Sequence, residues 1–294
     1  MINYLVSSLL VCLLCFTGVH CQHRSDDSGI KVMTYNIRYD NPGDGEHAWP
    51  NRKEWLSQWV LDEQIAILGI QEGLEHQVAY LEEKLEQFSS YGVGRDDGKS
   101  KGEFCAIFYR TKQFESLKQG TFWLSETPGS VSTGWDAALP RIASWLILKD
   151  KRNQQEFIVI NTHFDHRGEQ ARRESAKLLL QKIPALADGR PVILMGDFNV
   201  SPTTDVYQSL IASPLLNDAY SRAEMPSGVD RTFSGFEVSA TPTGHRIDYI
   251  FVSTRFEVIS HTIFDNSRDG KYPSDHLPVA AELLLNNDKD PASK

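Results

Sequence analysis

Several short polar motifs in the sequence stand directly beside runs of apolar residues. The clearest is VILMGDFNV, where an apolar run ends at Gly196, with Asp197 and Asn199 after it. Burying a carboxylate at such a strand end costs free energy unless a cation or hydrogen-bond donors compensate it. Similar motifs contain Asn36 in MTYN, Glu72 in GIQE, His163 in INTH, Asp248 in RIDYIFV, and Asp275 with His276 in PSDH.

Each of these residues, taken alone, has an ordinary structural explanation. Asn36 fits a turn, His163 fits a buried core histidine, and Glu72 fits the start of a helix, where a carboxylate is favoured. Asp248 follows Arg246 closely and fits a structural ion pair. Together, however, the residues stand at strand ends, and strand ends at one edge of an α/β sheet converge on one crevice. We therefore expect them to share a site.

The chemistry of the crevice follows from its carboxylates, which belong to Glu72, Asp197, Asp248 and Asp275. Carboxylates gathered in one place repel one another, and a divalent cation would offset that repulsion. Oxygen ligands favour Mg²⁺ or Mn²⁺. We expect Glu72 to bind the metal, with Asn36 beside it directly or through a water. Such a site could orient a water and neutralise the charge of a phosphoester, as hydrolysis requires.

The elements that must position these residues alternate between strands and helices. Strands are predicted at Ile30–Ile37, Ile65–Glu72, Phe104–Tyr109, Ile142–Leu148, Phe157–Thr162, Val192–Gly196, His245–Val252 and Leu277–Leu285. Helices are predicted at Asn51–Leu61, His76–Phe88, Glu169–Ile183 (ended by Pro184) and within Ser201–Leu210, with a loop at Asn41–Pro50. This alternation predicts an α/β protein, and strands that follow one another without a helix indicate a mixed sheet. No linker divides residues 30–286, so we predict a single domain.

The motifs TYNIR, IQE, NTHFDH, MGDFNVSP, HRIDYIFV and SDHLPV occur in the order found in the endonuclease/exonuclease/phosphatase superfamily. The chain resembles that superfamily, which includes DNase I-like nucleases, inositol-polyphosphate 5-phosphatases and neutral sphingomyelinases. WPNRKEW, FWLSETP and WDAALPR are similar to a branch of mostly exported proteins. The resemblance implies a DNase I-like, four-layer α/β sandwich, with two mixed β-sheets packed face to face and helices outside.

The resemblance also implies roles for the polar residues. Asp197 would orient and deprotonate the attacking water, and Asn199 would steady the water or the phosphate. His276 would donate to a phosphoryl oxygen, with its tautomer held by Asp275. Asp248 would support this cluster or approach a second metal.

Three further residues are candidates for contact with the substrate phosphate. The resemblance implies such a contact for His163. Arg141 in LPRIASW and Arg167 in DHRGE could bind phosphate, and a structural or solvated role fits each of them equally well.

The implied activity is that of a divalent-metal-dependent hydrolase of phosphoester bonds, either a phosphodiesterase or a phosphatase. The substrate would be a nucleic acid, an inositol or sugar phosphate, or a phospholipid head group. One alternative is a catalytically silent binding module on the same fold. Another is a sphingomyelinase-like head-group hydrolase rather than a nuclease, for which Gly120–Trp135 is the candidate membrane-contacting hairpin. Trp123 and Trp135 of that segment also fit the core or the pocket wall.

The overall charge of the chain makes tight non-specific binding of nucleic acids less favourable. The chain has 294 residues, a formal net charge of −9 and a pI of about 5.5. A tight non-specific nucleic-acid binder carries a broad basic surface, which this composition does not favour.

The N-terminal sequence indicates export. Residues 1–21 carry no charged side chain and match the apolar core of a signal peptide, with cleavage near Cys21. The mature protein would be secreted or periplasmic, with Cys105 as its only thiol and no internal disulfide; a lipid on Cys21 is the alternative. Residues 22–29 would be a disordered lead-in and 287–294 a polar tail. We expect a monomer without a stable membrane span.

Overall fold

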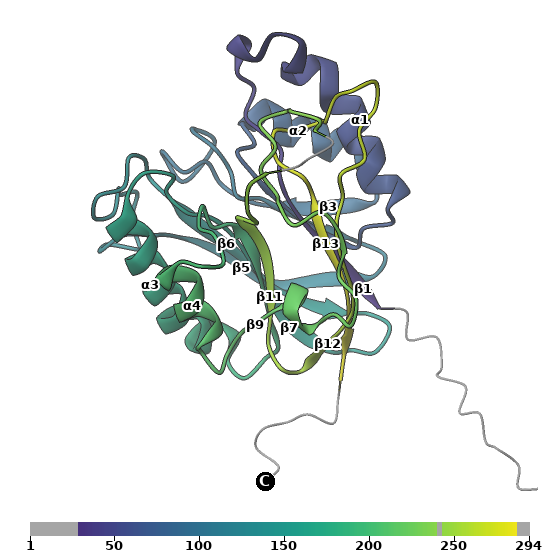
Figure 1. Cartoon of the computed structure of the whole chain (residues 1–294). Coiled ribbons are helices and arrows are strands. Elements are labelled where there is room, and N and C mark those ends of the chain that lie inside the picture. The colour runs from purple at the N-terminus through teal and green to yellow at the C-terminus, as the bar shows by residue number, and fades with distance from the viewer. Residues whose placement is uncertain (1–28, 240–242, 287–294) are drawn as a thin grey trace, which may run out of the picture.

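Two β-sheets form the centre of the computed structural model, which describes residues 29–239 and 243–286 (Figure 1). The strand order of the first sheet is β10 (Ser227–Gly228), β12 (Phe256–Ile263), β13 (Val279–Leu285), β1 (Ile30–Asn36), β2 (Ile67–Gln71), β4 (Ile107–Arg110), β3 (Phe88–Tyr91). That of the second sheet is β5 (Phe114–Trp123), β6 (Ile142–Asp150), β7 (Glu156–His163), β8 (Val192–Asp197), β11 (Asp248–Val252), β9 (Asn217–Asp218). Both sheets are mixed, because β1–β2, β7–β8 and β10–β12 are parallel and the other pairs are antiparallel.

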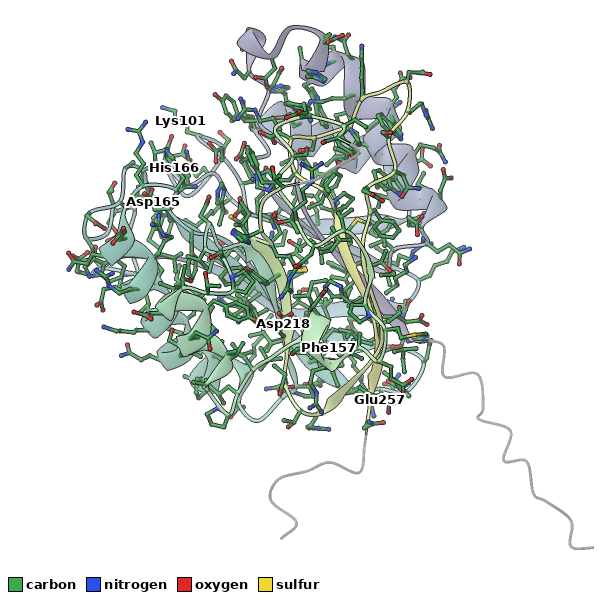
Figure 2. All side chains as sticks on the ribbon, viewed as in Figure 1. Lys101, Phe157, Asp165, His166, Asp218 and Glu257 are labelled. Carbon is green, nitrogen blue, oxygen red and sulfur yellow. The ribbon has the colours of Figure 1, made fainter. Side chains whose placement is uncertain are left out.

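Helices cover the outer face of each sheet. The first sheet packs against α1 (Trp49–Asp62) and α2 (Glu75–Lys84), and the second against α3 (Glu169–Ala187) and α4 (Asp205–Ile211). A short 3-10 helix, η1 (Pro42–His47), and helix α5 (Ala219–Arg222) lie in connections. The apolar side chains between the sheets, among them Phe157 (Figure 2), form the central core. The predicted four-layer sandwich is therefore confirmed.

Some predicted boundaries differ from the structure. The helix from Glu169 does not end at Pro184 but continues to Ala187. Pro184 is exposed, so the carbonyl that loses its usual N–H partner can bind water instead. The helix predicted for His76–Phe88 ends at Lys84, because Phe88 already begins the edge strand β3. Strands β3, β5 and β12 were not among the predicted strands.

The strand directions explain why the polar motifs converge. The parallel pairs β1–β2 and β7–β8 bring four carboxyl ends to the same side of the two sheets. Strand β11 runs antiparallel to β8, and β13 runs antiparallel to β1, so these two strands begin where the others end. All of the strand-end motifs therefore face one region at the junction of the sheets.

The predicted signal peptide (1–21), all of the lead-in except Gly29, and the predicted tail (287–294) lie outside the described residues. Within the described ranges, no helix is both long and apolar enough to cross a membrane. Cys105 is buried and not in a disulfide.

Gly196 provides a test of how closely β7 and β8 must approach. It has a φ of 152°, and a Cβ atom added there would lie 2.0 Å from the carbonyl oxygen of Thr162. We expect Gly196→Ala to lower the free energy of unfolding by about 2–4 kcal/mol, because the clash is with backbone. Chemical denaturation measures the loss. Gly129→Ala, where an added Cβ meets nothing within 4 Å, is the matched control. Equal stability of the two variants would contradict this prediction.

Candidate active site

Three site residues lie side by side across the second sheet. In the strand register, His163 at the end of β7 pairs with Asp197 on β8, and Asp197 pairs with Asp248 on β11. All three side chains are buried. Neighbouring strands are about 4.8 Å apart, so this register alone brings the imidazole and both carboxylates within reach of one another.

The first sheet contributes Asn36 at the end of β1, Glu72 just after β2, and the segment before β13. Asn36 Nδ2 donates to Glu72 Oε1 and to Asp197 Oδ2, each at 3.0 Å. The Ser274 hydroxyl donates to the Asn36 carbonyl at 2.7 Å and fixes the segment that carries His276. One buried amide therefore joins carboxylates from both sheets.

Two of the predicted site residues have left-handed backbones although neither is glycine. The φ of Glu72 is 64° and that of Asn199 is 50°. This conformation is unfavourable for residues with a Cβ atom and is found where the surroundings enforce it, often at functional sites. Glu72 gains two donors in return, Asn36 Nδ2 and the backbone N–H of Tyr39 at 3.2 Å.

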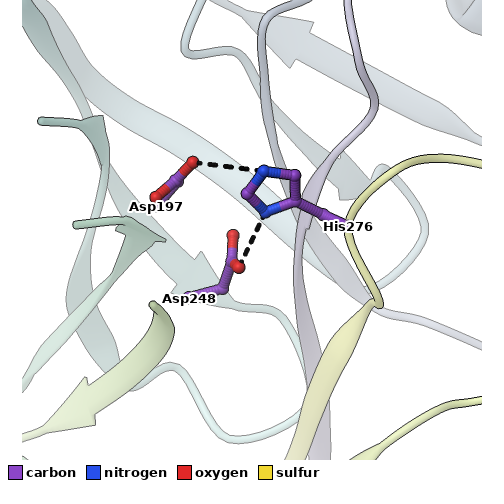
Figure 3. Close-up of side chains that lie close together, drawn as sticks. All are labelled: Asp197, Asp248 and His276. Atoms are coloured by element: carbon purple, nitrogen blue, oxygen red, sulfur yellow. Dashed lines mark hydrogen bonds and ion pairs between the residues drawn. The ribbon is translucent and has the colours of Figure 1, made fainter. Parts of the chain in front are cut away.

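His276 is oriented by Asp248 (Figure 3). Its Nδ1 donates to Asp248 Oδ2 at 2.9 Å, while Nε2 lies 3.7 Å from Asp197 Oδ2. Burial by itself lowers the pKa of His276, but Asp248 and Asp197 together raise that pKa well above its usual range. The ring is therefore an imidazolium near neutral pH, with its Nε2–H directed toward Asp197.

This geometry corrects the predicted partner of His276. Asp275 does not bind the ring: its Oδ2 lies 3.5 Å from Arg38, and its Oδ1 accepts from the Ser274 hydroxyl at 3.4 Å. Asp275 lies in a bend and directs its carboxylate toward Arg38 and Ser274, whereas the ring of His276 faces Asp248. Asp248 takes the supporting role, through the hydrogen bond of its Oδ2 with His276 Nδ1.

Asp197 is a buried carboxyl group whose pKa is raised. Burial raises its pKa, the neighbouring Asp248 raises it further, and the result is about 7. Asn36 Nδ2 and the backbone N–H of Asn199, at 2.9 Å, are its hydrogen-bond donors. A carboxylate with a pKa close to neutrality is well suited to act as a general base.

His163 differs from His276 in its protonation. Burial lowers the pKa of His163 well below its usual range, and Arg141 lowers it further, so the ring is neutral. Asn199 Nδ2 donates to the Phe164 carbonyl and faces His163 Nε2, both at 3.1 Å, which makes Nε2 the acceptor. The ring proton is thus on Nδ1, 3.9 Å from Glu103.

Glu103 was not a predicted site residue. Arg95 holds it with two hydrogen bonds of 2.7 and 2.9 Å, and burial raises its pKa. It directly precedes the predicted strand at Phe104, in a segment without a recognisable motif, so a pattern of strand ends did not reveal it. Arg38, within the TYNIR motif, was also missed as a site residue.

Arg141 is a buried residue of the cavity wall. Its Nε donates to Asp165 at 3.2 Å and its Nη2 faces His166 at 2.9 Å, two residues that Figure 2 labels. Its Nη1 is also buried and has no hydrogen-bond partner among the described residues. Arg167 is exposed and is not among the residues that line the cavity, so its substrate role stays a prediction. Its backbone N–H instead donates to Asp165 at 2.9 Å.

The side chains surround a cavity of about 550 Å³. Its lining residues are Arg38, Tyr39, Glu72, Glu103, Leu139, Arg141, His163, His166, Asp197, Asn199, Phe233, Ile247, Asp275 and His276. This volume is in the range of small-molecule sites. Of the predicted catalytic, metal-binding and substrate residues, those that are not in the lining are Asn36 and Asp248, which lie buried behind it, and Arg167.

The site has the properties that a divalent cation requires. Burial raises the pKa of Asp197 and of Asp275, and Asp248 Oδ1 is buried without a hydrogen-bond partner among the described residues. Asp197, Asp248 and His276 also place ligand-type atoms within 4.8 Å of one another. We favour Glu72 as the binding position, since His276 Nδ1 is committed to Asp248 and hard cations prefer oxygen. Asn36 turns its Nδ2 toward Glu72 and its Oδ1 toward the Arg38 N–H at 3.0 Å, so it holds the Glu72 carboxylate in place rather than offering an oxygen beside it.

Comparisons with known proteins agree with this geometry. A model of the Endonuclease/Exonuclease/phosphatase family matches residues 33–276. A mannosyl-6-phosphatase from Bacteroides thetaiotaomicron is 40% identical, covers 87% of this chain and 100% of its own, and has a TM-score of 0.84. An endonuclease/exonuclease/phosphatase family protein from the same organism is 39% identical over 88% and 98%, with a TM-score of 0.85. Nocturnin from Rattus norvegicus is 23% identical, over 94% of this chain and 70% of its own length.

The pairing of His276 with Asp248 can be tested in the folded protein. Asp248→Asn should markedly lower the pKa of His276, because it removes the negative partner of Nδ1 while keeping the size of the side chain. Asp275→Asn should lower this pKa less, since Asp275 makes no hydrogen bond to the ring. A pH titration of the His276 ring nitrogens by NMR measures both. A larger decrease in Asp275→Asn would reverse the assignment of the partner.

Proposed function

The chain belongs to the endonuclease/exonuclease/phosphatase family, a family of phosphoester hydrolases, and we propose that it is a divalent-metal-dependent phosphatase acting on small sugar phosphates. The observation that carries this proposal is the convergence of Asp197, His276 and Glu72 from two sheets on one cavity. These residues supply a base, a cationic hydrogen-bond donor and an oxygen ligand, the groups that phosphoester hydrolysis needs.

Asp197 and His276 have different roles at the phosphoryl group, one as a proton acceptor and the other as a hydrogen-bond donor. The Asp197 carboxylate accepts the proton of the attacking water, and its raised pKa makes that transfer favourable. The His276 imidazolium donates from Nε2 to a phosphoryl oxygen, whose negative charge it stabilises as the bond to the leaving oxygen breaks. Asp248 keeps the ring protonated and fixed in this orientation.

The remaining residues position the phosphate and the water. Asn199, His163 and Arg141 line the cavity together with Asp197, and Arg141 has an Nη1 without a hydrogen-bond partner among the described residues. Glu72, positioned by Asn36, would hold Mg²⁺ or Mn²⁺, which when bound would supply positive charge for the phosphate oxygens.

Two observations favour a sugar phosphate over the other phosphoesters. The mannosyl-6-phosphatase that is 40% identical aligns over all of its own chain, and a net charge of −9 disfavours long polyanions. A membrane substrate has less support. Trp123, in the candidate hairpin, is buried and donates from its indole to the Arg95 carbonyl at 2.8 Å. Trp135, in the same segment, is partly buried.

We further propose that the protein is exported and acts as a monomer. The uncharged, apolar residues 1–21 support export through a signal peptide. N-terminal sequencing of the mature protein from the extracellular or periplasmic fraction tests this part separately from the activity.

The catalytic assignment predicts the effect of three substitutions. Asp197→Asn and His276→Ala should each reduce kcat/KM for a hexose 6-phosphate by about 10²–10⁴-fold, since each removes a group that acts in the transition state. Asp265→Asn, an exposed aspartate that does not line the cavity, is the matched control and should retain activity. Steady-state phosphate release measures all three. Full activity of Asp197→Asn would overturn the assignment.

The metal requirement is tested by chelation. EDTA should abolish phosphate release, and added Mg²⁺ or Mn²⁺ should restore it, because the site carries more negative than positive charge. Turnover that EDTA does not affect would exclude the metal. If the wild type released no phosphate from mono- and diesters with either ion, the silent binding module would be the better description.

A further inference from the structure

Phe233 is an exposed aromatic residue at the edge of the catalytic cavity. Its side chain is 48% exposed and belongs to the cavity lining. Its ring lies edge-on to the His276 ring, with centroids 5.2 Å apart and an interplanar angle of 72°. Exposing an aromatic face of this size costs free energy unless a ligand or partner covers it.

The backbone around Phe233 is fixed by the strands that carry the catalytic residues. Leu277 N donates to the Thr232 carbonyl at 2.6 Å, and Ser234 N donates to the Asp275 carbonyl at 2.7 Å. The Thr232 hydroxyl oxygen accepts from Asp248 N at 3.0 Å. The exposed ring is therefore held in place relative to His276 rather than carried on a free loop.

A second exposed apolar side chain lines the same cavity. Leu139 is 38% exposed. The backbone just before Leu139 is held in place, because Ala138 N donates to Asp165 at 3.1 Å. Asp165 also accepts a hydrogen bond from Arg141 at 3.2 Å. Apolar surface and phosphate-binding groups thus occur together in one cavity, the usual composition of a site that binds and orients a small organic ligand.

We propose that Phe233, with Leu139, forms the leaving-group subsite and binds the apolar face of a pyranose ring. This inference rests on the proposed function, because a phosphate held by His276 places the ester substituent within reach of a ring only 5.2 Å away. A pyranose presents C–H groups on its face and hydroxyls around its rim. The face packs on Phe233, and the hydroxyls meet polar lining side chains such as Glu103 and Tyr39.

The test compares substrates with and without a ring. For mannose 6-phosphate, Phe233→Ala should raise KM about tenfold, the effect of losing roughly 1.4 kcal/mol of contact. For glycerol 3-phosphate, which has no ring, the change in KM should be several-fold smaller. Phe233→Trp should retain the preference for the hexose phosphate, and Phe233→Leu should not, since the flat aromatic face is what the sugar contacts.

Ile259→Ala is the matched control, because Ile259 is a similarly exposed (45%) apolar residue on β12 that does not line the cavity. It should leave both substrates unchanged. If Phe233→Ala raised KM equally for both substrates, the proposed subsite would be overturned, and Phe233 would be assigned to the support of His276. If Phe233→Ala raised KM more for adenosine monophosphate than for the hexose phosphate, the subsite would be assigned to a nucleobase instead of a sugar.

A failure of the proposed function is distinguishable from a failure of this inference. If the wild type hydrolyses neither substrate, the proposed function fails. Calorimetric titration with mannose 6-phosphate then decides the inference: weaker binding by Phe233→Ala than by the wild type and by Ile259→Ala supports the subsite, and equal affinity overturns it.

Discussion

Asn36 donates a single buried amide group to carboxylates from both sheets, and the site is organised around that contact. Glu72 and Asp197 lie at the ends of strands in different layers, and each accepts from Asn36 at 3.0 Å. Without such donors, burying these carboxylates where two sheets meet would be strongly unfavourable. The imidazolium of His276, between Asp248 and Asp197, supplies the nearest positive charge. The acid–base chemistry of the site follows from this limited compensation.

The two histidines of the site have different protonation states because their surroundings differ. Asp248 and Asp197 face His276, so its ring is protonated despite burial. Burial, together with the nearby Arg141 and Arg95, lowers the pKa of His163, and its ring is neutral. Such divergence within one site assigns a cationic donor role to one imidazole and an accepting or positioning role to the other.

Much of the fold and most of the site followed from strand-end motifs, because the strands that carry them are strongly apolar and the sheet brings their ends together. The features of the site and the fold that the sequence did not predict depend on how the folded chain places side chains beside one another. The adjacency of Asp275 and His276 suggested a pair, but in the bend that carries them Asp275 faces Arg38 while the ring of His276 binds Asp248. Strand β5 was missed because its middle is exposed and polar, and Glu103 because its contact with His163 crosses between sheets.

The pairing of β1 with β13 joins two distant parts of the sequence, and the Ser274–Asn36 contact within that junction spans 238 residues. The catalytic imidazole arrives with the segment that leads into β13. Because β13 pairs with both β1 and β12, the edge of the first sheet and the position of His276 depend on the same late segment. A chain that ended before residue 273 would therefore lack both the strand that joins this sheet and the cationic donor of the site.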